Sequence, residues 1–288
     1  MLPGKIVETL PEPAAIPHGE GRIWQVDFPG QEPSYLFGTI HVTNPKVFDL
    51  PEAAETAFAS ARFVAFESSL EEVSEEEKRR QLELPDDTRL FDVVGEETYR
   101  RMKALALFRY FRIERLDRLQ PWVVWNLIAG REISVDIRRE DGKPVLDDWL
   151  QIRAVEEGKE VVHLETATQQ LDVFAGMPIE DQVSMLRSAI DGYGDTHIKV
   201  ERIQLYLEGK LAVRYALWQR FIEQLEPEVG QRFHERILDG RNRNMTESLL
   251  PVFARGSTFV AVGALHMPGE AGILSLLEQR GFTVTRLH

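Results

Sequence analysis

Two apolar stretches that contain the same motif decide the fold: YLFGTIHV at residues 35–42 and TFVAVGALH at residues 258–266. Apolar runs of this length are typical of buried strands. Each contains Gly-x-x-His, which places Gly38 before His41 and Gly263 before His266. In open parallel sheets, ligands bind outside the carboxyl ends of the strands. If the two strands are neighbours, the repeated motif predicts that both histidines face one crevice.

A third apolar run, RFVAF at residues 62–66, ends at Glu67. An Ala-rich helix is expected just before it, at residues 51–61, with Pro51 at its first turn. Strand, helix and strand within about 30 residues have the size of a parallel βαβ unit. A buried carboxylate without a partner is costly, so Glu67 needs a counter-charge or a metal.

The remaining patterns predict an α/β (α+β) protein. Residues 1–84 and 251–288 form a mixed β-sheet core with flanking helices, and residues 85–250 form a large, mainly helical insertion with one strand near 159–164. All 288 residues are expected to form a single domain. Trp122 and Trp125 are expected to pack inward. Further strands are predicted at 22–28 and 282–287. Helices are predicted at 71–84, at 96–126 with a break near Arg118, at 147–157, 181–190 and 198–225, at 228–250 in one or two pieces, and at 273–280.

Composition excludes several functions. Lys and Arg number 34 against 47 Asp and Glu, so the formal net charge is −13, which opposes binding to nucleic acid or to an anionic membrane. The absence of cysteine removes disulfides, thiolate metal sites and a cysteine nucleophile. No signal-like apolar segment opens the sequence, and no run reaches the roughly 20 apolar residues of a membrane span. A cytoplasmic protein is expected.

Two histidines and a carboxylate at strand ends suit a metal. His41, Glu67 and His266 could bind Zn²⁺, Mn²⁺ or Co²⁺ and leave one position open for water. Such an ion lowers the pKa of the water and polarises a carbonyl. The residues are far apart in the sequence, unlike a local motif such as His-Glu-x-x-His.

The same residues resemble a known family. YLFGTIHV, VAFES and VAVGALHMPGEAGILSLLEQRGFTV are similar to segments of the TraB/GumN family, whose distant members include the membrane-tethered Tiki proteases of animals. The resemblance implies a divalent-metal hydrolase, with peptide cleavage as the reaction. In that family the two Gly-x-x-His motifs and the glutamate form the site. These hallmarks fall on His41, His266 and Glu67.

Further family features match with one departure. The Arg-Asn-x-x-Met motif falls on Arg241 and Asn242, and a strand-end glutamate followed by a glutamine falls on Glu165 and Gln170. An arginine here could hold a substrate carboxylate or stabilise an oxyanion. The family's Gly-x-Asp aligns best with Asp147, although its glycine is replaced by valine. The poorer register is residues 134–136, which would select Asp136 instead.

The resulting hypothesis is a hydrolase with one divalent metal. His41 and His266 bind the ion, Glu67 is the third ligand or a general base, and metal-bound water attacks a peptide carbonyl. Arg241 and Asn242 position the substrate or stabilise the oxyanion. Two alternatives stay open. One is a metal-free hydrolase in which histidine and glutamate activate water, as in the broadly similar erythromycin-esterase class. The other is a non-catalytic protein that binds a peptide or small ligand.

Overall fold

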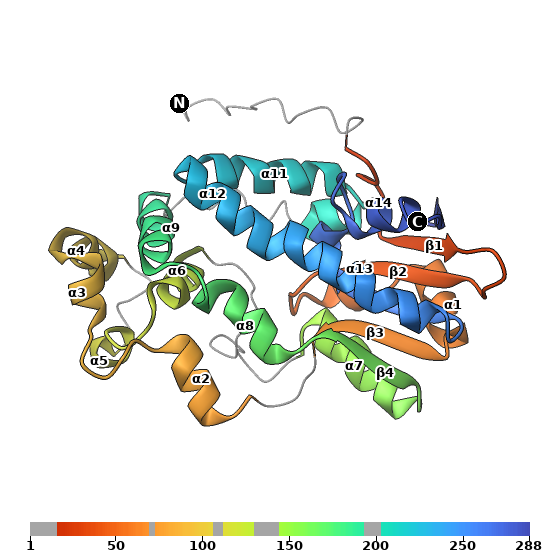
Figure 1. The fold of residues 1–288 in the computed structure, drawn as a ribbon, viewed down its shortest axis with the longest axis horizontal. Coiled ribbons are helices and arrows are strands. Elements are labelled where there is room, and N and C mark those ends of the chain that lie inside the picture. The colour runs from red at the N-terminus through yellow and green to blue at the C-terminus, as the bar shows by residue number, and fades with distance from the viewer. Residues whose placement is uncertain (1–15, 69–72, 106–111, 130–143, 193–202) are drawn as a thin grey trace.

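The computed structural model describes residues 16–68, 73–105, 112–129, 144–192 and 203–288. Six strands form one sheet in the order β4-β3-β5-β2-β1-β6, which Figure 1 shows together at one end of the molecule. Every predicted strand is present, and the α/β class is confirmed. The strands are β1 (Ile23–Asp27), β2 (Ser34–Thr39), β3 (Phe63–Ser68), β4 (Glu160–Glu165), β5 (Thr258–Gly263) and β6 (Thr283–Arg286).

The sheet is mixed, and its centre is parallel. Strands β2, β5, β3 and β4 run parallel, whereas β1 pairs antiparallel with both β2 and β6. The register places Gly38 opposite Val262 and Thr39 opposite Gly263, so the two Gly-x-x-His motifs are neighbours. The predicted βαβ unit is present, but β5 lies between its two strands. Continuous burial of the apolar residues of β5 suits this central position.

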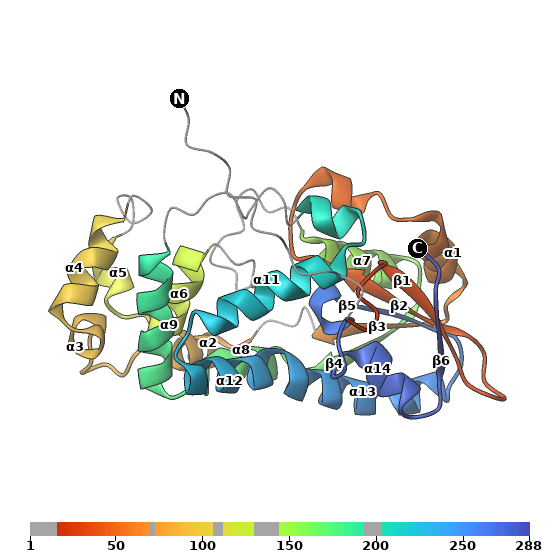
Figure 2. The same cartoon turned by 90° about the horizontal axis from the view of Figure 1, so that it is seen from above.

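Helices cover both faces of the sheet. Figure 2 shows α1 (Glu52–Ser60) and α7 (Leu146–Glu156) on one face, and α13 (Gly240–Phe253) and α14 (Ile273–Glu278) on the other. The apolar residues beneath them form one hydrophobic cluster with the strands. This packing leaves the carboxyl ends of the parallel strands facing the helical part of the chain.

Helices of the described middle part of the chain form a second hydrophobic cluster. Its centre is aromatic: Trp122 stacks on Phe174 at 5.2 Å between ring centroids, and Trp125 meets Phe233 edge-on at 5.5 Å. Both tryptophans are fully buried, as predicted. The helices are α2 (Glu75–Leu82), α3 (Leu90–Val94), α4 (Glu96–Ala104), α5 (Ile113–Leu116), α6 (Pro121–Ala129), α8 (Ala167–Ala175), α9 (Ile179–Asp191), α11 (Leu211–Glu223) and α12 (Pro227–His234).

The helix predictions need correction in two respects. The continuous helix expected at 198–225 is wrong within its described part, because the chain turns at 208–210 and α11 begins only after it. Gly209 has a φ of +67° there, and a Cβ would lie 3.1 Å from the Gly21 nitrogen. Helices α3 and α8 were not predicted, although Thr166 and Gln169 form a capping box at the start of α8. Asp136 and parts of the predicted helices 71–84, 96–126 and 198–225 lie outside the described residues.

Across the described ranges, none of the helices combines the length and the apolar character that crossing a bilayer requires. The assignment of the whole chain to a single domain stays a prediction.

Candidate functional site

The carboxyl ends of four parallel strands meet at one edge of the sheet. Glu67 is the penultimate residue of β3, and Glu165 is the last residue of β4. His41 follows β2 by two residues, and His266 closes the short helix η7 (Ala264–His266) after β5. Each side chain therefore reaches the same edge because the strands that carry it point in one direction.

Gly263 lies where the three predicted ligands converge. A Cβ at this position would lie 3.0 Å from Glu67 Oε1, 3.7 Å from His41 Nε2 and 3.5 Å from His266 Cδ2. The Gly263 N–H also donates to Glu67 Oε1. The missing side chain thus leaves room for two imidazoles and a carboxylate beside one backbone atom.

Asn242 fixes the orientation of His266. Asn242 Nδ2 donates to the Ala271 carbonyl at 2.8 Å, which leaves Asn242 Oδ1 to accept from His266 Nδ1 at 2.6 Å. The Nε2 atom of His266 then carries a lone pair toward the cluster, 3.2 Å from Arg241 Nη1. Burial, together with the Arg241 charge, lowers the pKa of His266 to about 3, so this imidazole is neutral.

A carboxylate orients His41 in a similar way. His41 Nδ1 lies 3.0 Å from Asp147 Oδ2, and Thr39 Oγ1 donates to the other Asp147 oxygen. Burial lowers the pKa of His41, but attraction to Asp147 outweighs this and raises it to about 9. The His41 side chain is 28% exposed, against 7% for His266, so the cluster is most accessible from the His41 side.

Arg241 connects the two strand-end glutamates. Its Nη2 lies 2.7 Å from Glu67 Oε2 and 2.8 Å from Glu165 Oε2, and its Nε donates to Glu165 at 3.0 Å. Burial would raise the pKa of Glu67, but the Arg241 charge holds it well below its usual range. Burial raises the pKa of Glu165, with Arg241 acting against it. With Nη1 directed at His266 and the Ile237 carbonyl, every nitrogen of this guanidinium has a protein partner.

The first motif's glycine serves packing. A Cβ on Gly38 would lie 3.1 Å from the Cα and Cβ of Ala264, so glycine allows β2 to approach the turn that carries His266. Tyr206, which the sequence did not single out, donates its hydroxyl to the Gly38 carbonyl at 2.9 Å. Gln170 lies on the unpredicted helix α8 and donates to Glu67 Oε2 at 3.3 Å.

A π-helical turn, η6 (Glu235–Asp239), joins α12 to α13 and aims the arginine and asparagine. Phe233 and Leu238 are both buried, although five positions on an α-helix turn about 140° beyond a full rotation. The wider π turn returns Leu238 toward the face of Phe233. Arg241 and Asn242 follow at the next turn and reach the sheet edge.

The chemistry of these side chains fits a divalent cation. His266 Nδ1 is hydrogen-bonded to Asn242 and His41 Nδ1 lies beside the Asp147 carboxylate, and an oxygen next to Nδ1 is the usual setting of a metal-binding histidine. His41 directs Nε2 toward Gly263, whereas His266 Nε2 faces Arg241 Nη1. Within the described ranges, however, no three His, Asp or Glu side chains are spaced as a metal-holding group. Arg241 explains this spacing because its Nη1 and Nη2 lie against His266 and Glu67.

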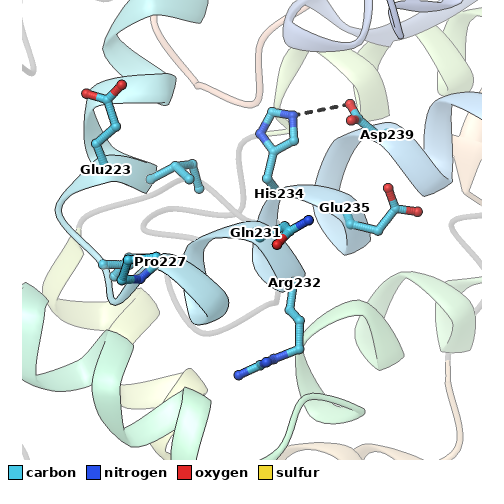
Figure 3. A pocket seen from close by; sticks show the side chains of 9 residues that line it. Glu223, Pro227, Gln231, Arg232, His234, Glu235 and Asp239 are labelled. Carbon is cyan, nitrogen blue, oxygen red and sulfur yellow. Dashed lines mark ion pairs between the residues drawn. The ribbon is translucent and has the colours of Figure 1, made fainter.

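A separate cleft of about 780 Å³ lies in the helical part of the chain (Figure 3). His234 Nε2 lies 3.2 Å from Asp239 Oδ1, and His234 Nδ1 accepts from the Trp218 indole at 2.9 Å. Ile222, Leu225 and Pro227 supply apolar lining. None of the predicted site residues lines this cleft, so it is distinct from the cluster at the sheet edge.

Fold and site together define an α/β protein with paired Gly-x-x-His motifs beside two buried glutamates. Residues 22–286 match the TraB/PrgY/gumN family, and the chain belongs to that family. Among curated proteins it is similar to metalloprotease TIKI2 of Danio rerio, with 24% identity over 91% of this chain and 60% of the relative. Metalloprotease TIKI1 of Xenopus tropicalis is also 24% identical, over 88% of this chain and 59% of its own length.

A Tiki homologue of Nematostella vectensis, also described as a metalloprotease, is 23% identical over 88% of this chain and 64% of its own length. The chain thus spans about three fifths of these curated relatives. No solved structure matches it. All three of these relatives are described as metalloproteases.

Proposed function

We propose that this protein is a divalent-metal-dependent hydrolase that cleaves peptide bonds. The observation that carries the proposal is the convergence of His41, His266 and Glu67 on Gly263. The metalloproteases among its relatives support the same reaction class. Mn²⁺, Co²⁺ and Zn²⁺ all accept two imidazoles and a carboxylate.

The charges of the cluster favour a doubly charged ion. Glu67, Glu165 and Asp147 supply three carboxylates, and Arg241 supplies the one positive charge in contact with two of them. Imidazoles bind metals in the neutral form. Because the raised pKa of His41 keeps it protonated at neutral pH, a bound ion would displace that proton. With both imidazoles neutral, the cluster has a formal charge of −2, which one divalent cation would neutralise.

The side chains take distinct roles in this proposal. His41 and His266 present Nε2 to the ion, and Glu67 is the third ligand or a general base. Asn242 and Arg241 are positioning residues, because their polar atoms are engaged with protein groups rather than directed at a substrate. A bound divalent ion supplies a lowered pKa for water and polarises the scissile carbonyl.

The test measures metal content and peptide cleavage on protein purified without affinity histidines or added metal. We expect about one divalent ion per chain after incubation with Mn²⁺, Co²⁺ or Zn²⁺. Cleavage of a peptide library should be lost in chelator and in His41→Ala and His266→Ala. His18, which pairs with Glu278 and, among the described residues, contacts none of the site residues by hydrogen bond or ion pair, offers the control His18→Ala, which should retain activity. Folded His41→Ala and His266→Ala proteins with full activity would refute the proposal.

The same experiment separates the two alternatives. A metal-free hydrolase is compatible with the contacts that Arg241 makes to Glu67 and His266. Such an enzyme should remain active in chelator yet require the histidines. A binding protein should retain one peptide per chain without cleaving it. Either result would replace the metalloprotease proposal.

A further inference from the structure

We propose that Arg22 anchors a carboxylate-binding subsite next to His41; this inference rests on the proposed peptide hydrolase and deepens it. Arg22 precedes β1, which runs antiparallel to β2, so it lies at the same edge of the sheet as the candidate site. Its carbonyl accepts from the Gly38 N–H at 2.8 Å. Gly38 begins the motif that ends at His41.

The Arg22 guanidinium is buried without a counter-ion. The residue is 6% exposed, and among the described residues no acceptor is hydrogen-bonded to its Nε or Nη1. Its Nη2 lies 3.3 Å from the Nε2 of His288. No carboxylate of the described residues forms an ion pair with it. Burying a cation in this way is costly unless an anion joins it.

The neighbours of Arg22 do not provide that anion. Its guanidinium lies 5.5 Å from the centre of the Tyr206 ring, and a second guanidinium, that of Arg214, lies 5.8 Å from the same centre. Burial raises the pKa of Tyr206 far above neutrality, so the phenol carries no charge. Two arginines therefore flank one neutral ring. A carboxylate that also acts on this ring, Asp147, already accepts from Thr39 and lies beside His41.

A carboxylate is the anion that a peptide substrate carries. The subsite is tied to the site through Tyr206, whose hydroxyl donates to the Gly38 carbonyl. A carboxylate held by Arg22 would fix the peptide next to the strand end that carries His41. The group is either the terminal carboxylate of the peptide or the side chain of an aspartate or glutamate, since guanidinium donors recognise both.

The direct test is binding of N-acetylglycine, which has a carboxylate, against N-acetylglycinamide, which does not. Calorimetry on the metal-free full chain should show N-acetylglycine binding at least tenfold tighter. Arg22→Gln should abolish this preference, and Arg22→Lys should retain part of it. The matched control is Arg286→Gln, because Arg286 lies on the adjacent β6 but is exposed and paired with Glu20. It should keep the preference.

Equal binding of the two probes by the unmodified protein would overturn the proposal, even if Arg22→Gln fails to fold. Equal loss in Arg22→Gln and Arg286→Gln would also overturn it. Peptide pairs then identify the source: a preference for a free over an amidated C-terminus assigns the terminal carboxylate, and a preference for Glu over Gln assigns a side chain. If the enzyme cleaves peptides but shows neither of these preferences, the subsite is refuted and the hydrolase proposal stands. Arg22-dependent N-acetylglycine binding without any cleavage refutes the hydrolase alone.

Discussion

Replacing Gly263 by alanine tests the shared site most directly. The new methyl group would lie 3.0 Å from Glu67 Oε1 and 3.7 Å from His41 Nε2, so it would enter the space that the three groups enclose. A contact of 3.0 Å requires the carboxylate to retreat by a few tenths of an ångström. That movement also strains the hydrogen bond from the Gly263 N–H to Glu67. We expect metal affinity to fall by at least about tenfold.

The fold should tolerate the same substitution. Gly263 has φ −52° and ψ 131°, a conformation open to alanine, which gains about 0.4–1 kcal/mol through the unfolded state. Overpacking costs about 1–3 kcal/mol, so the net loss of stability should lie between about 0 and 2.6 kcal/mol. Gly38→Ala is the contrasting variant, because its methyl group meets the backbone of Ala264 and should lower stability more.

The assays are calorimetric metal titration, peptide cleavage and thermal unfolding of both glycine variants. Gly263→Ala should unfold close to the unmodified protein yet bind metal weakly and cleave slowly. If it binds Mn²⁺, Co²⁺ and Zn²⁺ with unchanged affinity and keeps full activity, then His41, His266 and Glu67 do not enclose one ion. The reasoning from the glycine would then be refuted.

Three further variants probe the surrounding side chains. Asn242→Ala removes the acceptor of His266 Nδ1 and should weaken metal binding about 10–100-fold, measured by calorimetry. Arg241→Leu leaves two buried carboxylates without their counter-charge and should cost about 3–5 kcal/mol in urea unfolding; a loss below 1 kcal/mol would contradict this. In chelator, a His41 pKa raised to about 9 should stabilise the fold fully below pH 6.5 and lose that contribution as the pH rises through 9. Asp147→Asn should flatten this dependence in melting curves.

Strand positions could be predicted from sequence because each depends on a local pattern, whereas the functional roles of the residues at the strand ends stay a prediction. The apolar runs that end at His41, Glu67 and His266 specify buried strands. The structure adds the physical reason for each glycine: Gly38 admits the Ala264 backbone, whereas Gly263 admits the side chains of the site.

Contacts between distant side chains could not be predicted in this way. The sequence suggested a substrate-binding role for Arg241, but nothing local indicates that Glu67 and Glu165 use its donors. Helix α8 was missed because its capping residues are separated from any strong apolar period. The turn at Gly209 was missed because an isolated glycine within a helical pattern is often tolerated.

The position of β5 between β2 and β3 has a consequence for how the chain folds. A nascent polypeptide that has reached only residue 250 holds both neighbours of this strand but lacks the strand itself. The two open edges can then pair with other chains, so synthesis passes through an aggregation-prone stage. Contacts between segments more than 200 residues apart also slow folding. Assistance from a chaperone should therefore matter most just before the last strands emerge from the ribosome.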